Sequence, residues 1–133
     1  MRQNAFEEWA KGKMKNTAAD ESGARAVAKY YAKVPPARLR RLNQIRRAFR
    51  QSGLKTREVI KYQIPALECS GAWVGMANQK DHICVYFRGP EFIRNIRKKH
   101  PELSVGVGCV RIRDSQEIPL REMVRSFKKA MKV

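Results

Sequence analysis

The sequence predicts an α+β domain in which helices pack on one face of an antiparallel sheet, with an extra helix at the N-terminus. Three observations support this fold class. Apolar residues recur at helical spacing towards both ends of the chain, and β-rich runs separated by turn residues lie between them. The chain has 133 residues, which is an ordinary length for one domain. Its hydrophobic content of 43% indicates a packed core, because disordered chains are poorer in apolar residues.

The N-terminal segment is predicted to lie outside the main domain. Residues 4–15 have the apolar spacing of a helix, with Phe6 and Trp9 on one face, and a polar stretch follows them. We therefore divide the chain into residues 1–20, an amphipathic helix with its linker, and residues 21–133, the main domain. This separation predicts that the first segment is dispensable for the fold.

Four helices are predicted in the main domain, over about residues 21–33, 37–51, 90–99 and 119–131. Proline opens the last three, because its fixed φ suits the first helical turn. Gly53 follows the second helix, where a left-handed cap is favoured. The expected core joins side chains of these helices to those of the strands: Tyr31, Leu42, Phe49, Val85, Phe87, Ile112 and Phe127.

The predicted strands cover residues 57–62, 73–78, 82–87 and 105–113. Each is rich in β-branched or aromatic residues and is bounded by turn residues. Pro65 is expected to lie beyond the end of the first strand, because proline cannot donate to a sheet ladder. The short polar loop between the second and third strands predicts a β-hairpin.

Alternation along each strand predicts which side chains face the helices. In residues 82–87 the apolar set is expected to face them, which turns His82, Cys84 and Tyr86 to the other side of the sheet. We call this other side the outer face. In the first strand Tyr62 is expected to join the core with Ile60.

The outer face is predicted to combine an aromatic ring, an imidazole, thiols and cations, which suits an anionic or planar ligand. The candidate ligand-binding residues are Lys61, Tyr62, Trp73, Asn78, His82, Tyr86 and Arg111. Lys61 and Arg111 would supply charge, Tyr86 a stacking surface and His82 a hydrogen bond, while the faces of Trp73 and Asn78 stay unassigned. The alternative is an ordinary solvated sheet face, which antiparallel sheets commonly have.

Positive charge is the strongest signal in the composition. The chain has 29 Lys and Arg against 12 Asp and Glu, a formal net charge of +17. Such a field attracts polyanions such as nucleic acid or an acidic membrane surface. The alternative is a basic surface that serves only solubility.

The sequence contains no recognisable catalytic motif, so a non-enzymatic role is expected, without a cofactor. Its three cysteines are widely spaced, which argues against a disulfide framework or a structural zinc site. His82, Cys84 and Cys109 could form a cysteine–histidine nucleophile pair or a soft metal site, and the alternative is that the cysteines are ordinary buried residues. No apolar run approaches the roughly 18 residues of a membrane span, and the first residues lack a signal-peptide core. A cytoplasmic location is therefore expected.

Several segments resemble the YdhG-like domain family. They are residues 58–66, EVIKYQIPA, residues 73–87, WVGMANQKDHICVYF, and residues 108–113, GCVRIR, with the closing amphipathic helix. The resemblance covers about residues 24–132. It implies an α+β fold with helices on an antiparallel sheet and, from some members, a frataxin-like role in carrying intracellular iron.

We expect a non-catalytic module that binds an anionic ligand, a small molecule or a nucleic acid, through the outer face. Iron binding or delivery is the alternative that the resemblance implies. It would need clustered oxygen ligands, whereas the acidic residues are scattered along the sequence. A third alternative is an interaction domain, in which Phe6 and Trp9 dock on a partner protein or on a second copy in a homodimer.

Overall fold

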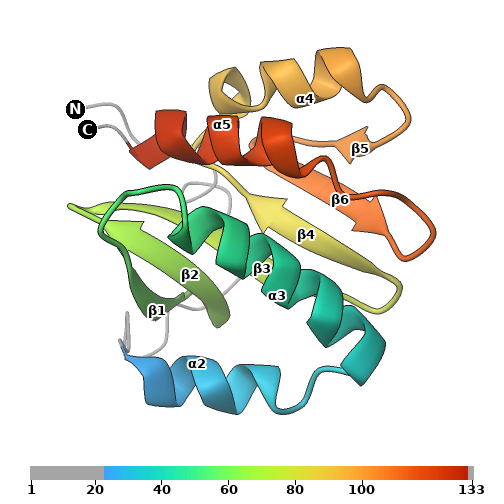
Figure 1. Ribbon diagram of the computed structural model, residues 1–133. Helices are drawn as coiled ribbons and strands as arrows, with labels where there is room; N and C mark the ends of the chain where they lie inside the picture. The colour runs from blue at the N-terminus through green and yellow to red at the C-terminus, as the bar shows by residue number, and fades with distance from the viewer. Residues whose placement is uncertain (1–22, 132–133) are drawn as a thin grey trace.

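The computed structural model describes residues 23–131, in which four helices accompany one twisted sheet (Figure 1). The helix predicted over residues 4–15 lies outside the described residues. The helices are α2 (Ala24–Tyr31), α3 (Pro36–Arg50), α4 (Arg94–Lys99) and α5 (Leu120–Met131), with a 3-10 turn η1 (Pro90–Phe92) before α4. No helix within residues 23–131 is long and apolar enough to cross a lipid bilayer.

The six strands form one antiparallel sheet in the order β1-β2-β3-β4-β6-β5. They are β1 (Arg57–Lys61), β2 (Ile64–Cys69), β3 (Ala72–Asn78), β4 (His82–Tyr86), β5 (Ser104–Val105) and β6 (Cys109–Arg113). The predicted hairpin is present as β3 and β4, which pair from Asn78 with Ile83 to Gly75 with Tyr86. The α+β class with helices on a sheet is therefore confirmed.

Strand β2 is absent from the sequence prediction, which took Pro65 as a boundary. A two-residue turn connects β1 to β2, and both of its residues have positive φ: 51° at Tyr62 and 69° at Gln63. Hairpin turns of this kind favour Asn and Gly, so this turn carries no sequence signal. Pro65 pairs with Ile60 of β1 and precedes the part of β2 that pairs with β3. It therefore removes no bond from the β2–β3 ladder.

The strand predicted over residues 105–113 is divided in two by a turn. β5 ends at Val105 and β6 begins at Cys109, and the two strands pair with each other. Gly108 within the turn has a φ of 76°, and a side chain there would bring its Cβ to 2.9 Å from the carbonyl oxygen of Phe87. The turn therefore needs glycine at this position for both its conformation and its close approach to the end of β4.

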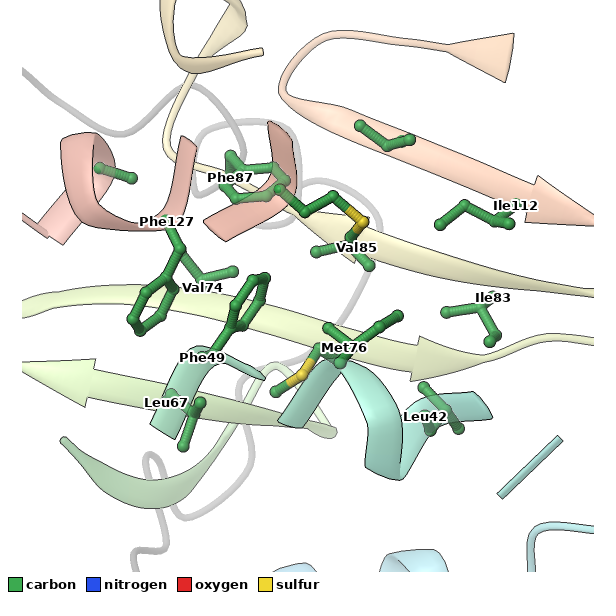
Figure 2. Close-up of a cluster of buried hydrophobic side chains, with 14 of the residues drawn as sticks. Leu42, Phe49, Leu67, Val74, Met76, Ile83, Val85, Phe87, Ile112 and Phe127 are labelled. Atoms are coloured by element: carbon green, nitrogen blue, oxygen red, sulfur yellow. The ribbon is translucent and has the colours of Figure 1, made fainter. Parts of the chain in front are cut away.

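The main core lies between the helices and the sheet, and all four described helices contribute buried side chains to it. The rings of Phe49 on α3 and Phe127 on α5 are stacked, with centroids 4.3 Å apart and planes 8° apart. Figure 2 shows this pair above β2 and β3, with Phe87 close by. The seven side chains predicted to form the core are all buried there, as expected.

Phe127→Ala tests this packing. The ring is fully buried against Phe49, so we expect a loss of about 3–5 kcal/mol in the free energy of unfolding, measured by urea denaturation. Arg125→Ala on the exposed side of the same helix should change it by less than about 0.5 kcal/mol. Equal effects of the two substitutions would contradict the packing of α5 described above.

Candidate ligand-binding site

The outer face of the sheet carries a second buried cluster, which is mostly apolar. Its nine members are each at most 8% exposed and come from five strands and the β1–β2 turn: Val59, Tyr62, Ile64, Ala66, Trp73, Ala77, Cys84, Tyr86 and Cys109. This differs from the solvated polar face considered in the sequence analysis. Tyr62 belongs to this cluster and not to the main core, because the positive-φ turn that begins at this residue takes it out of the alternation of β1.

A row of paired residues crosses the outer face and explains its shape. Val59, Ala66, Gly75, Tyr86 and Cys109 are successive partners from β1 to β6. Ala66 and Gly75 are among the smallest residues, so this row adds little side-chain volume above β2 and β3. Larger side chains lie beside this row. Among them, the ring of Trp73 packs against that of Tyr62 at a centroid distance of 5.9 Å.

Gly75 in this row provides space for two neighbours. A Cβ at this position would lie 2.9 Å from Cδ1 of Ile64 and 3.1 Å from Cζ3 of Trp73. Both distances are shorter than an ordinary contact, so the side chains of Ile64 and Trp73 occupy the space above the glycine.

A cavity of about 330 Å³ opens on the outer face where β4 and β6 meet. Its walls combine cationic, aromatic, thiol and aliphatic groups: Gln79, His82, Cys84, Tyr86, Val107, Cys109 and Arg111. Alternation along β4 and β6 places five of these side chains on one side of the sheet. Val107, from the turn before β6, is 65% exposed.

The structure brings three of the seven candidate residues together in this cavity: His82, Tyr86 and Arg111. Tyr62 and Trp73 lie on the same face within the buried cluster. The ammonium group of Lys61 lies 3.3 Å from a carboxylate oxygen of Glu68 in an ion pair.

Asn78, the remaining candidate, is bound to elements of the helical layer. Its side-chain oxygen accepts a hydrogen bond from Arg38 of α3 at 3.2 Å. Its backbone N–H donates to the hydroxyl of Tyr30 of α2 at 2.9 Å. These contacts assign Asn78 a role in joining β3 to the helices.

Two polar contacts fix the cationic side of the cavity. Nδ1 of His82 lies 2.7 Å from a carboxylate oxygen of Asp81. Arg111 donates to the hydroxyl of Ser104 on β5 at 3.1 Å, which leaves further guanidinium donors for another group. Burial raises the pKa of Tyr86, so its hydroxyl remains a donor at neutral pH.

The two cysteines of the cavity were not among the predicted ligand-binding residues. The strand register makes the Cys84 thiol a diagonal neighbour of Cys109, and hydrogen bonding from this thiol, together with the nearby Arg111 guanidinium, lowers the pKa of Cys109 below its ordinary value. The same pairing and burial raise the pKa of Cys84. Alternation could place both thiols on the outer face, but only the strand register shows that they are neighbours.

Within the described part of the chain, no three His, Cys, Asp or Glu side chains are grouped so that they could hold a metal ion. The structure therefore gives no centre on which to build the iron-binding alternative or a soft metal site at His82.

Comparison with known proteins supports the fold. No protein-family model matches the sequence, and no curated protein matches it. A solved structure of a DUF1801-family protein, YdhG from Bacillus subtilis, matches with a TM-score of 0.69 and 14% sequence identity. The match covers 80% of this chain and 88% of that one. The chain thus has a YdhG-like α+β fold, in agreement with the resemblance found in the sequence.

Gly75→Ala tests the packing of the outer face. The new Cβ would crowd Ile64 and Trp73, so we expect a net loss of about 1–2 kcal/mol in the free energy of unfolding. Ile64→Val removes the Cδ1 atom at 2.9 Å, so Gly75→Ala should cost less in that background. A cost that is the same in both backgrounds would show that Ile64 does not limit the space.

Proposed function

We propose that this domain binds a small anionic ligand with an apolar or aromatic body, without catalysis, in the outer-face cavity. The observation that carries the proposal is the position of the Arg111 guanidinium at a cavity whose other walls include Tyr86 and the exposed side chain of Val107. Carboxylate and phosphate groups pair with guanidinium in a bidentate geometry. An aromatic ring attached to such a group could pack on Tyr86.

The size and surroundings of the cavity support the same ligand class. A volume of about 330 Å³ lies at the lower end of the range of small-molecule sites, which favours a ligand of one ring over a dinucleotide. Arg111 also lines a second cavity, to which Arg113 adds another guanidinium group and Asp81 and Glu102 add carboxylates. The net charge of +17 would raise the local concentration of any anion.

Titration with benzoate, followed by amide NMR shifts, tests the proposal. We expect saturable shifts confined to residues 82–86 and 107–111, with no comparable response to benzyl alcohol, which has the ring without the charge. Arg111→Gln should weaken benzoate binding by about tenfold or more, because a charge-assisted hydrogen bond contributes roughly 1.5–3 kcal/mol. Arg125→Gln removes the same charge from the exposed face of α5 and should leave the affinity unchanged.

The same spectra separate this function from nucleic-acid binding. A surface cavity of about 430 Å³ on α3 is lined by Asn43, Arg46, Arg47, Arg50 and Gln51, and it would contact phosphates in that alternative. Shifts in α3 with none near Arg111, or equal effects of Arg111→Gln and Arg125→Gln, would overturn the proposal of an outer-face site.

A further inference from the structure

We infer that Cys109 is a nucleophilic thiol site, open to small electrophiles through the outer-face cavity, with Cys84 as its hydrogen-bond donor. The site uses the cavity of the proposed function but does not depend on anion binding. Its evidence is the arrangement of three groups around one sulfur atom: a neighbouring thiol, a guanidinium and a glycine without a side chain.

Gly106 allows the sulfur and the guanidinium to approach the same stretch of backbone. A Cβ on Gly106 would lie 3.0 Å from Sγ of Cys109 and 3.4 Å from a terminal nitrogen of Arg111. The backbone N–H of Gly106 donates to the carbonyl oxygen of Cys109 at 2.9 Å, which holds the two backbones together at this point. A thiolate at this position would be stabilised by a thiol donor and a cation, as in other reactive cysteines.

Both cysteines are free thiols, and the strand register shows how they lie relative to each other. Cys84 pairs with Arg111, and Cys109 pairs with Tyr86, so the two cysteines are diagonal neighbours. Diagonal residues are about 7–8 Å apart, whereas a disulfide needs Cα atoms within about 6.8 Å. Cys84 is thus suited to keep Cys109 ionised, and the reaction open to Cys109 is attack on an external electrophile.

Iodoacetamide is a neutral probe of this reaction. The Cys109 thiolate attacks the methylene carbon, the new S–C bond forms as the C–I bond breaks, and iodide leaves with the bonding electrons. Because the sulfur is already ionised, no further base is required. The proton was released to solvent when the thiolate formed.

The test measures the pH dependence of alkylation in the folded full-length protein, with Cys69, Cys84 and Cys109 resolved by peptide mass spectrometry. We expect the Cys109 rate to rise with a midpoint clearly below the value near 8.5 that an ordinary thiol shows, because the neighbouring thiol and the Arg111 guanidinium lower its pKa. Cys84→Ala and Arg111→Gln should each raise the midpoint by about one unit. Arg125→Gln should not move it.

The midpoint is the decisive measurement, because a thiolate of low pKa is also a weaker nucleophile and its rate alone is ambiguous. A Cys109 midpoint at 8.5 or above, or labelling of Cys109 only in urea, would overturn the inference. Benzoate binding can fail while this midpoint stays low, so the failures of the two proposals are distinguishable.

A separate observation concerns what covers the second cluster. The cluster draws its nine side chains from strands and the β1–β2 turn, and no described helix contributes to it. Trp73 is nevertheless only 2% exposed and Val59 only 1%. We propose that residues 1–22 pack across the outer face over β1, β2 and β3, beside the cavity.

The position where the described chain begins supports this occupant. The N–H of Gly23 donates to the carbonyl oxygen of Glu58 on the edge strand β1 at 3.1 Å. Gly23, from which residues 1–22 extend, therefore lies at the edge of the sheet, beside the β1 residue that precedes Val59. A helix over residues 4–15 would be about 18 Å long, which is enough to cross the three adjacent strands β1, β2 and β3 at a spacing of about 4.8 Å.

The shape of the face suits the apolar residues of that segment. Ala66 and Ala77 have short side chains on this face, and the spacing of Phe6 and Trp9 predicts one bulky apolar stripe that would pack over them. Burial of such a stripe would stabilise the domain, so this proposal departs from the sequence-based prediction that residues 1–20 are dispensable.

The fluorescence of Trp73 can show whether residues 1–22 cover the outer face. The chain has two tryptophans, so substitution of Trp9 leaves Trp73 as the single fluorescent tryptophan. We compare acrylamide quenching of Trp73 in full-length Trp9→Phe, which keeps an apolar ring, with Trp9→Asp and the milder Trp9→Ala. The proposal expects a low quenching constant in Trp9→Phe, and a several-fold higher constant with red-shifted emission in the other two. Lys11→Ala in the Trp9→Phe background, a change off the stripe, should leave Trp73 protected.

Equal quenching of Trp73 in the three Trp9 variants, each shown folded by near-native circular dichroism, would overturn the proposal. Protection that disappears on dilution, together with a dimer mass by light scattering, would instead show that a second copy covers the face.

Discussion

The outer face depends on the absence of a side chain at Gly75. This residue lies in the middle of the paired row from Val59 to Cys109, where Ile64 and Trp73 already occupy the space that a Cβ would need. Trp73 can therefore pack close to the sheet and contact Tyr62. The sheet carries a buried cluster on each side. The helices cover the inner face, whereas the cluster on the outer face is built from strands and the β1–β2 turn.

The helices and the inner face were largely predictable because they depend on local periodicity. The stripes through Leu42, Phe49 and Phe127 define which side of each helix is apolar, and the structure buries those sides together. Strand β2 was not predictable in this way. Its start depends on positive φ at Tyr62 and Gln63, residues that rarely adopt this conformation, so tertiary packing and not turn propensity determines the hairpin.

The structure brings some of the predicted site residues together and separates others, for a physical reason. Alternation along β4 and β6 places His82, Tyr86 and Arg111 on one face, because period two is a property of any strand, and the strand register makes them neighbours. Lys61 and Asn78 share the right residue types, but ion pairing with Glu68 and bonding to Arg38 engage them elsewhere. Such partners are distant in sequence, so single-sequence reasoning could not find them.

The distribution of carboxylates explains how so basic a protein could still select among anions. Six described acids are paired with cationic or imidazole groups: Glu58 with Arg46, Glu68 with Arg57 and Lys61, Asp81 with His82, Asp114 with Arg38, and both Glu102 and Glu122 with His100. These pairs lie on different elements of the fold, and the Lys and Arg residues in excess of the acids are spread around the molecule. A diffuse field attracts every anion alike and falls with salt. Selectivity in the anion binding proposed above would therefore have to come from a place where charge meets a shaped apolar wall, and Arg111 and Tyr86 line such a cavity together.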